Sequence, residues 1–103
     1  GPELSPLHHA AARGPASEID RLGSEGADVD ARDQACMTPL HHAAVSARVG
    51  VMERLIARGA DVNAKTQSGM SVLELARIDQ DHGSAGPRQD AVKLLQLHGA
   101  RAD

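Results

Sequence analysis

Two short sequence landmarks return at a constant spacing, and this limits the possible folds more than any other feature of the chain. The first landmark reads SPLH at 5–8, TPLH at 38–41 and SVLE at 71–74, so its copies start 33 residues apart. The second reads GADV at 26–29, GADV at 59–62 and GARA at 99–102, with spacings of 33 and then 40 residues. Periods of this length are typical of solenoids, in which each unit packs only against its neighbours. The longer last spacing predicts seven extra residues in the third unit.

Each repeating unit is predicted to contain two short helices. A hydroxyl residue before proline favours a helix start, because the hydroxyl accepts hydrogen bonds from unpaired backbone amides. Ser71 and Glu74 have the spacing of a capping box. The second helix of each unit carries apolar pairs spaced i, i+3, which are Ile19 and Leu22, Met52 and Leu55, and Val92 and Leu95. The glycines that follow are typical of helix C-termini, so the sequence predicts an all-α fold with these pairs in columns.

Composition and charge exclude several function classes. The chain has no Phe, Tyr or Trp, so its core must use small side chains such as Ala10, Ala11, Ala43 and Ala44 at short range. Basic residues number 11 against 14 acidic ones, with no basic run, so nucleic acid is not an expected partner. No apolar run is long enough to cross a membrane. With Cys36 as the only cysteine, we expect an intracellular location, in the cytoplasm or nucleus.

The repeated segments at 38–41 (TPLH) and 59–64 (GADVNA) resemble the signature of ankyrin-repeat proteins. The resemblance implies an all-α solenoid of helix-turn-helix units with projecting hairpin turns. It divides the chain into repeats at 5–37, 38–70 and 71–103, the last with an insertion near 79–87. Residues 1–4 are expected to be a lead-in, because Gly1-Pro2 resembles a scar of protease cleavage. The resemblance also implies that His8 and His41 bond to the backbone of adjoining turns.

Three positions depart from the family pattern. Cys36 stands where the family usually has glycine, as at Gly69, so the first hairpin tip is expected to be either strained or differently shaped. His9 and His42 occupy a position that is usually apolar. In the third unit, Arg77 and Gln96 replace apolar residues of the second, which predicts a polar cap at the C-terminal end of the stack.

The resemblance also implies a partner-binding surface. It is formed by the residue before each Thr-Pro-Leu-His landmark, the hairpin tips and the residues after each Ala-Ala pair. Carried onto this chain, these are Met37, Met70, Gln34, Ala35, Gln67, Ser68, Arg13, Val45, Ser46, Ile78 and Asp79. Methionine suits adaptable contact surfaces because its unbranched thioether repacks easily. Alternatively, the methionines only pack against their neighbours in the hairpins.

No metal site, cofactor or catalytic site is expected. His41 and His42 are adjacent and point to different faces of a helix. His9 and His42 lie one repeat apart, and packed helices are about 8 to 10 Å from each other, whereas zinc needs ligands at about 2 Å. Catalysis requires a nucleophile and a base that converge in a pocket, which open repeat surfaces rarely provide. The protein is therefore not expected to be an enzyme.

Two further segments have two interpretations each. Asn63 resembles the ankyrin asparagines that an asparaginyl hydroxylase modifies, although an asparagine that stabilises its own turn is the simpler interpretation. The insertion near 79–87 either contacts a partner or forms a flexible loop, which its glycine and serine content favours.

The predicted function is a protein-interaction module that binds a protein or peptide, as a monomer unless it belongs to a longer repeat array. Two alternatives stay open. The chain could be a regulatory or targeting domain of a larger enzyme, or an assembly element that stacks end to end on further repeats. The full-length sequence distinguishes the first alternative, and the dependence of mass on concentration distinguishes the second.

Overall fold

The computed structural model describes residues 6–78 and 85–100 of the chain. Six helices occupy these ranges: α1 (Pro6–Arg13), α2 (Ala16–Ser24), α3 (Pro39–Val45), α4 (Val49–Ala57), α5 (Val72–Arg77) and α6 (Ala85–Leu97). The only β-type pairing among the described residues is an isolated antiparallel bridge between Lys65 and Ser71. The all-α prediction is therefore confirmed. None of the described helices combines the length and apolar character that a membrane span requires.

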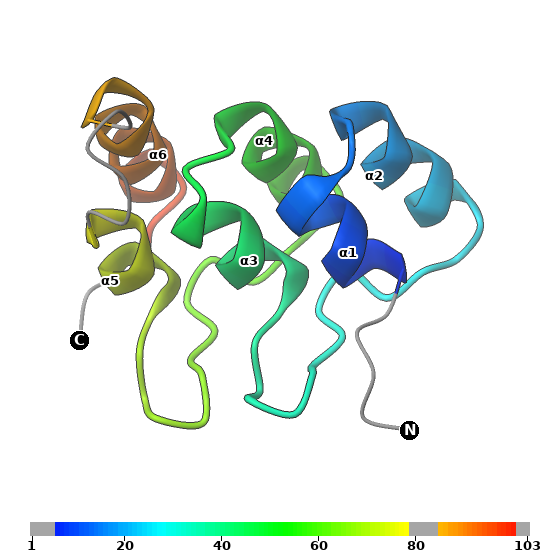
Figure 1. The fold of residues 1–103 in the computed structure, drawn as a ribbon, viewed down its shortest axis with the longest axis horizontal. Helices are drawn as coiled ribbons and strands as arrows, with labels where there is room; N and C mark the ends of the chain where they lie inside the picture. The colour runs from blue at the N-terminus through cyan, green and yellow to red at the C-terminus, as the bar shows by residue number, and fades with distance from the viewer. Residues whose placement is uncertain (1–5, 79–84, 101–103) are drawn as a thin grey trace.

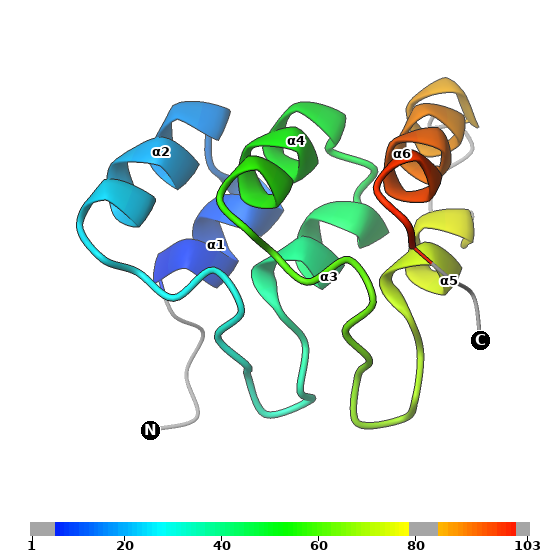
Figure 2. The same cartoon turned by 180° about the vertical axis from the view of Figure 1, so that it is seen from behind.

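The helices form two layers, with the hairpins projecting to one side (Figures 1 and 2). Helices α1, α3 and α5 form one layer, in which α3 packs against both of the others. Helices α2, α4 and α6 form the second layer in the same order, with α4 in the middle. Each unit thus contacts its neighbours along a single direction, as the constant spacing of the landmarks predicts.

Hydroxyl side chains begin the first helices of the second and third units. Ser71 Oγ accepts from the Glu74 amide at 3.0 Å, and Glu74 Oε1 accepts from the Ser71 amide at 3.3 Å, so the predicted capping box is confirmed. At the start of α3 the same reciprocal pattern uses a histidine ring. The Thr38 amide donates to His41 Nδ1 at 3.0 Å, and Thr38 Oγ1 accepts from the His41 amide.

The apolar pairs of the second helices form the predicted column. Ile19, Met52, Leu55 and Leu95 are fully buried and Leu22 nearly so, all in one continuous core cluster with the paired alanines. Val92 is only half buried, because α6 is the last helix of the described stack. Alanine at the helix contacts lets neighbouring backbones approach closely, which explains how a chain without aromatic residues excludes water from its core.

Helix α6 includes the last part of the expected insertion near 79–87. This helix has 13 residues, against nine in α2 and in α4, and it begins at Ala85. Residues 85–87 of the expected insertion therefore form the first turn of a helix. Residues 79–84, together with the lead-in at 1–4, lie outside the described part of the chain.

The first hairpin tip has the strained backbone that its cysteine predicts. Cys36 has a φ of 59°, and Gly69 at the equivalent place in the second hairpin has a φ of 86°. A side chain in this left-handed region costs about 1 to 2 kcal/mol, whereas glycine adopts it without steric cost.

We therefore expect Cys36→Gly to stabilise the protein by about 0.5 to 1 kcal/mol, since relief of strain exceeds the entropy lost by glycine. Urea unfolding followed by circular dichroism measures the change. Gly69→Ala is the matched control and should destabilise the protein by a similar amount. A Cys36→Gly variant less stable than the wild type would show that the tip is not strained.

Candidate functional site

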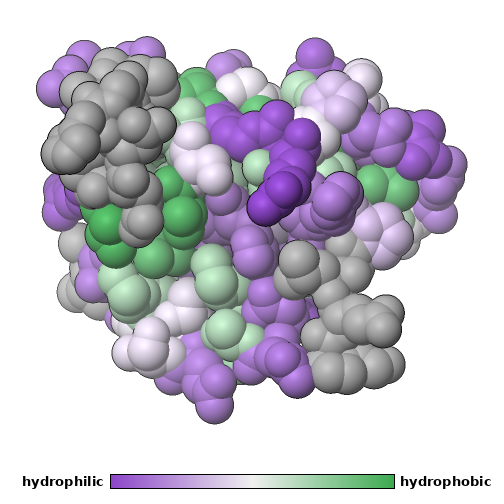
Figure 3. Space-filling view, in the orientation of Figure 1, coloured by the Kyte–Doolittle hydropathy of each residue, from purple (hydrophilic) through white to green (hydrophobic). Residues whose placement is uncertain are grey.

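A cavity of about 350 Å³ lies beside the ends of the two hairpins. We call it the hairpin cavity; its lining residues are Ala35, Met37, Thr66, Gln67, Ser68, Met70 and Leu75. Hydrophobic surface extends over α5 and continues in paler patches toward the hairpins (Figure 3). The two methionines and Leu75 come from successive repeats, so the cavity exists only because the units stack.

The first hairpin is organised by the carboxylate of Asp33. Its Oδ1 accepts hydrogen bonds from the backbone amides of Ala35 and Met37, both at 2.9 Å. The Asp33 amide in turn donates to the Met37 carbonyl at 3.1 Å. Burial raises the pKa of the Asp33 carboxyl, but hydrogen bonds from His42, Met37 and Ala35 lower it further, so the net pKa lies below its ordinary value. The hairpin is therefore closed by an ionised side chain.

The second hairpin uses a hydroxyl at the equivalent position. Thr66 Oγ1 accepts from the Met70 amide at 3.2 Å, and the Thr66 amide donates to the Met70 carbonyl at 2.9 Å. The two hairpins are also joined to each other. The Gln67 amide donates to the Ala35 carbonyl at 2.8 Å, and Arg32 Nη1 bridges the carbonyls of Cys36 and Lys65 at 2.9 and 2.7 Å. These bonds fix the spacing of the hairpins on the two sides of the cavity.

Five of the predicted binding residues line this cavity together: Ala35, Met37, Gln67, Ser68 and Met70. The other predicted residues do not line it. Gln34 is exposed in the first hairpin, and the rest of the described ones lie at or just after the ends of the first-layer helices, namely Arg13, Val45, Ser46 and Ile78. Asp79 lies outside the described residues.

Sequence reasoning missed two lining residues, Thr66 and Leu75. A signal for both was present in the repeat. Thr66 stands in register with Asp33, and Leu75 in register with His42, each 33 residues later. Leucine at the position of His42 places an apolar side chain, rather than an imidazole, at the wall of the cavity.

The histidines that precede each Ala-Ala pair have different environments. His8 Nε2 donates to the Met37 carbonyl at 2.8 Å, and His41 Nε2 donates to the Ala64 carbonyl at 3.0 Å, as the family resemblance implies. Burial is the largest effect on His41 and lowers its pKa below the ordinary value, although the bond to Ala64 opposes this. His9 is exposed, whereas His42 is half buried and donates from Nε2 to Asp33 Oδ2 at 2.8 Å.

Asn63 is exposed in the turn that follows α4. Its amide donates to Asp61 Oδ1 at 2.9 Å, and its side-chain Nδ2 donates to the Gly99 carbonyl of the third unit at 3.2 Å. These bonds agree with a residue that stabilises its turn. Its hydroxylation stays a prediction.

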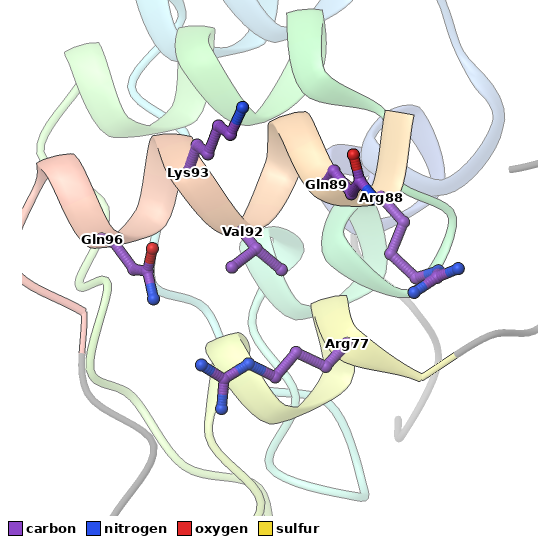
Figure 4. A pocket seen from close by; sticks show the side chains of 6 residues that line it. All are labelled: Arg77, Arg88, Gln89, Val92, Lys93 and Gln96. Carbon is purple, nitrogen blue, oxygen red and sulfur yellow. The ribbon is translucent and has the colours of Figure 1, made fainter. Parts of the chain in front are cut away.

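The C-terminal end of the stack has a second cavity, of about 330 Å³, between α5 and α6. Arg77 from α5 and Val92 and Gln96 from α6 face this space, whereas Lys93 and Arg88 point away from one another (Figure 4). Arg77 and Gln96 are exposed. A polar end of this kind agrees with the predicted cap, because a further repeat would have to desolvate these side chains.

Comparison with known proteins agrees with this geometry. A family model described as ankyrin repeats, three copies, matches residues 2–66. The chain belongs to the ankyrin-repeat family. Ankyrin repeats generally act as protein-interaction modules, and the fold is typically a non-catalytic one.

A solved structure extends the similarity to almost the whole chain. It is titled "Crystal structure of human ASB11 ankyrin repeat domain", and it matches with a TM-score of 0.79 and 30% sequence identity. The match covers 95% of this chain and 41% of the ASB11 chain, so the present ankyrin chain spans less than half the length of that domain. No curated protein sequence matches significantly.

Proposed function

We propose that this ankyrin-repeat chain binds a partner protein or peptide through the hairpin cavity and the adjoining surface of α1, α3 and α5. The observation that carries the proposal is the cavity itself, which brings Met37 and Met70 from successive hairpins to one apolar recess. Apolar side chains seated in such recesses supply much of the binding energy at protein interfaces. The predicted residues outside the cavity, such as Val45 and Ser46, then form the periphery of the contact.

The methionines suit this role because they are half buried. Their unbranched side chains can repack around different partner side chains. The hydrogen bonds between the two hairpins hold the recess in shape before a partner arrives, which lowers the entropic cost of binding.

The experiment is a quantitative pull-down with Met37→Arg and Met70→Arg. We expect each substitution to reduce partner capture at least about tenfold, because a charge is placed where an apolar side chain must be buried. Leu97→Arg is the matched control, since Leu97 is 81% exposed on α6 and outside the lining of the cavity. Circular dichroism confirms folding of each variant. If both methionine variants stay folded and keep every partner, the cavity is not the binding site.

A second candidate function is a regulatory or targeting domain of a larger enzyme. The observation that favours a longer protein is the partial coverage of the ASB11 domain, of which this chain matches 41%. The full-length sequence would show whether a catalytic domain accompanies the repeats. In either case we propose an intracellular protein, because its single half-buried cysteine suits a reducing compartment.

A further inference from the structure

Three side chains with metal-ligating atoms converge where the first repeat meets the second. His8 comes from α1, Asp33 from the first hairpin and His42 from α3, and one ligand atom of each lies within 4.8 Å of the others. His42 Nε2 and Asp33 Oδ2 are already 2.8 Å apart. The rings of His8 and His42 meet edge to face, with centroids 5.3 Å apart. The sequence-based argument against a metal site considered His9 together with His42. In the structure, the histidine beside His42 is His8.

The cluster is sheltered and held in position. His8 is 1% exposed, and the side chains of Asp33 and His42 are 9% and 19% exposed. Two backbone amides hold Asp33 Oδ1, which aims Oδ2 at His42. Hydrogen bonds of this kind orient ligating carboxylates in metal sites. The cluster therefore differs from a group of exposed acidic residues.

The next junction of the same stack shows that the fold does not require this cluster. There, His41 stands in register with His8, but Thr66 replaces Asp33 and Leu75 replaces His42. Helices α3 and α5 still pack, and Thr66 still closes its hairpin. The second junction thus retains the packing while lacking two of the three ligating side chains.

We propose that His8, Asp33 and His42 bind one zinc ion, with water as the fourth ligand. Two imidazoles and a carboxylate with one open position form a donor set that zinc accepts. Bonds of about 2.0 to 2.2 Å place ligand atoms about 3.3 Å apart in a tetrahedron. The distance between any two of the three ligand atoms must then change by about 1.5 Å or less when zinc binds. Ligation through His8 Nε2 exchanges its bond to the Met37 carbonyl for the metal bond.

The test is isothermal titration of the reduced, chelator-treated full chain with zinc chloride. We expect one zinc per chain, with a dissociation constant in the micromolar range or below, and a higher melting temperature in zinc. Titration with cobalt(II) should give the intense visible bands of a four-coordinate ion. The double substitution Asp33→Thr with His42→Leu copies the second junction, so it should fold, weaken zinc binding at least about tenfold and abolish the cobalt bands.

The control removes histidines that are exposed and outside the cluster, by His9→Ala with His98→Ala. This variant should bind zinc as the wild type does. The proposal is overturned by an absence of saturable zinc binding to the wild type. It is equally overturned if Asp33→Thr with His42→Leu binds zinc unchanged, or if the control variant loses binding to the same extent.

Discussion

Leu55→Ala is expected to lower the free energy of unfolding by about 2 to 5 kcal/mol, the range for truncation of a buried leucine. Leu55 is fully buried in α4, the middle helix of its layer, and belongs to the same core cluster as Leu22 and Leu95. The substitution therefore leaves a cavity in a layer that has no large aromatic side chains to fill it. Urea unfolding followed by circular dichroism measures the effect as a lower midpoint with an unchanged slope.

Leu97→Ala is the matched control for this prediction. Leu97 lies on α6 and is 81% exposed, so its truncation should change stability by no more than about 0.5 kcal/mol. If Leu55→Ala is already unfolded in buffer, the loss of stability is large and agrees with the prediction. A loss below about 0.5 kcal/mol would show that Leu55 is not in the core between repeats.

Arg48→Met is expected to lower the free energy of unfolding by about 1.5 to 3 kcal/mol, since the hydrogen bonds of a charged group are lost. Arg48 lies in the turn before α4, and its guanidinium reaches back to the C-terminal end of α1. Nη1 donates to the carbonyls of Ala10 and Ala11 at 3.1 and 2.9 Å, and Nη2 donates to the Gly14 carbonyl. One arginine of the second repeat thereby caps a helix of the first.

The matched control is Arg54→Met. Arg54 also belongs to the second repeat and pairs with Asp20 of the first, but the two side chains are 49% and 41% exposed. Exposed ion pairs contribute about 0 to 1 kcal/mol, so this substitution should have little effect. Thermal and urea unfolding of both variants distinguish them. Equal losses for Arg48→Met and Arg54→Met would contradict the capping role of Arg48.

The layers and the column of apolar pairs could be predicted because stacked units superimpose at a constant period. A residue and its counterpart 33 positions later share the same environment, so burial of Leu55 follows from the pattern that includes Leu22. These inferences require only that each unit repeats the local geometry of the previous one. Met37 and Met70 were instead placed on the binding surface by the resemblance to ankyrin repeats, and the period only sets them 33 residues apart.

The features that escaped prediction depend on contacts that the repeat does not preserve. Arg48 caps α1, and Asp33 lies beside His8, so each contact joins segments that are far apart in the sequence. The sequence does not repeat Arg48 or Asp33 one period later, so the period could not predict either contact. Both contacts depend on how a later loop packs against α1, which is the turn before α4 for Arg48 and the first hairpin for Asp33.

Hydrogen exchange with and without a captured partner tests the proposed function most directly. We expect the partner to slow exchange in the two hairpins, at 34–37 and 67–70, and along the exposed faces of α1, α3 and α5. Exchange in α2 and α4 should change little, because the proposed contact lies on the other layer. Protection confined to α2, α4 and α6, with both hairpins unchanged, would contradict the proposal that the partner binds at the hairpin cavity.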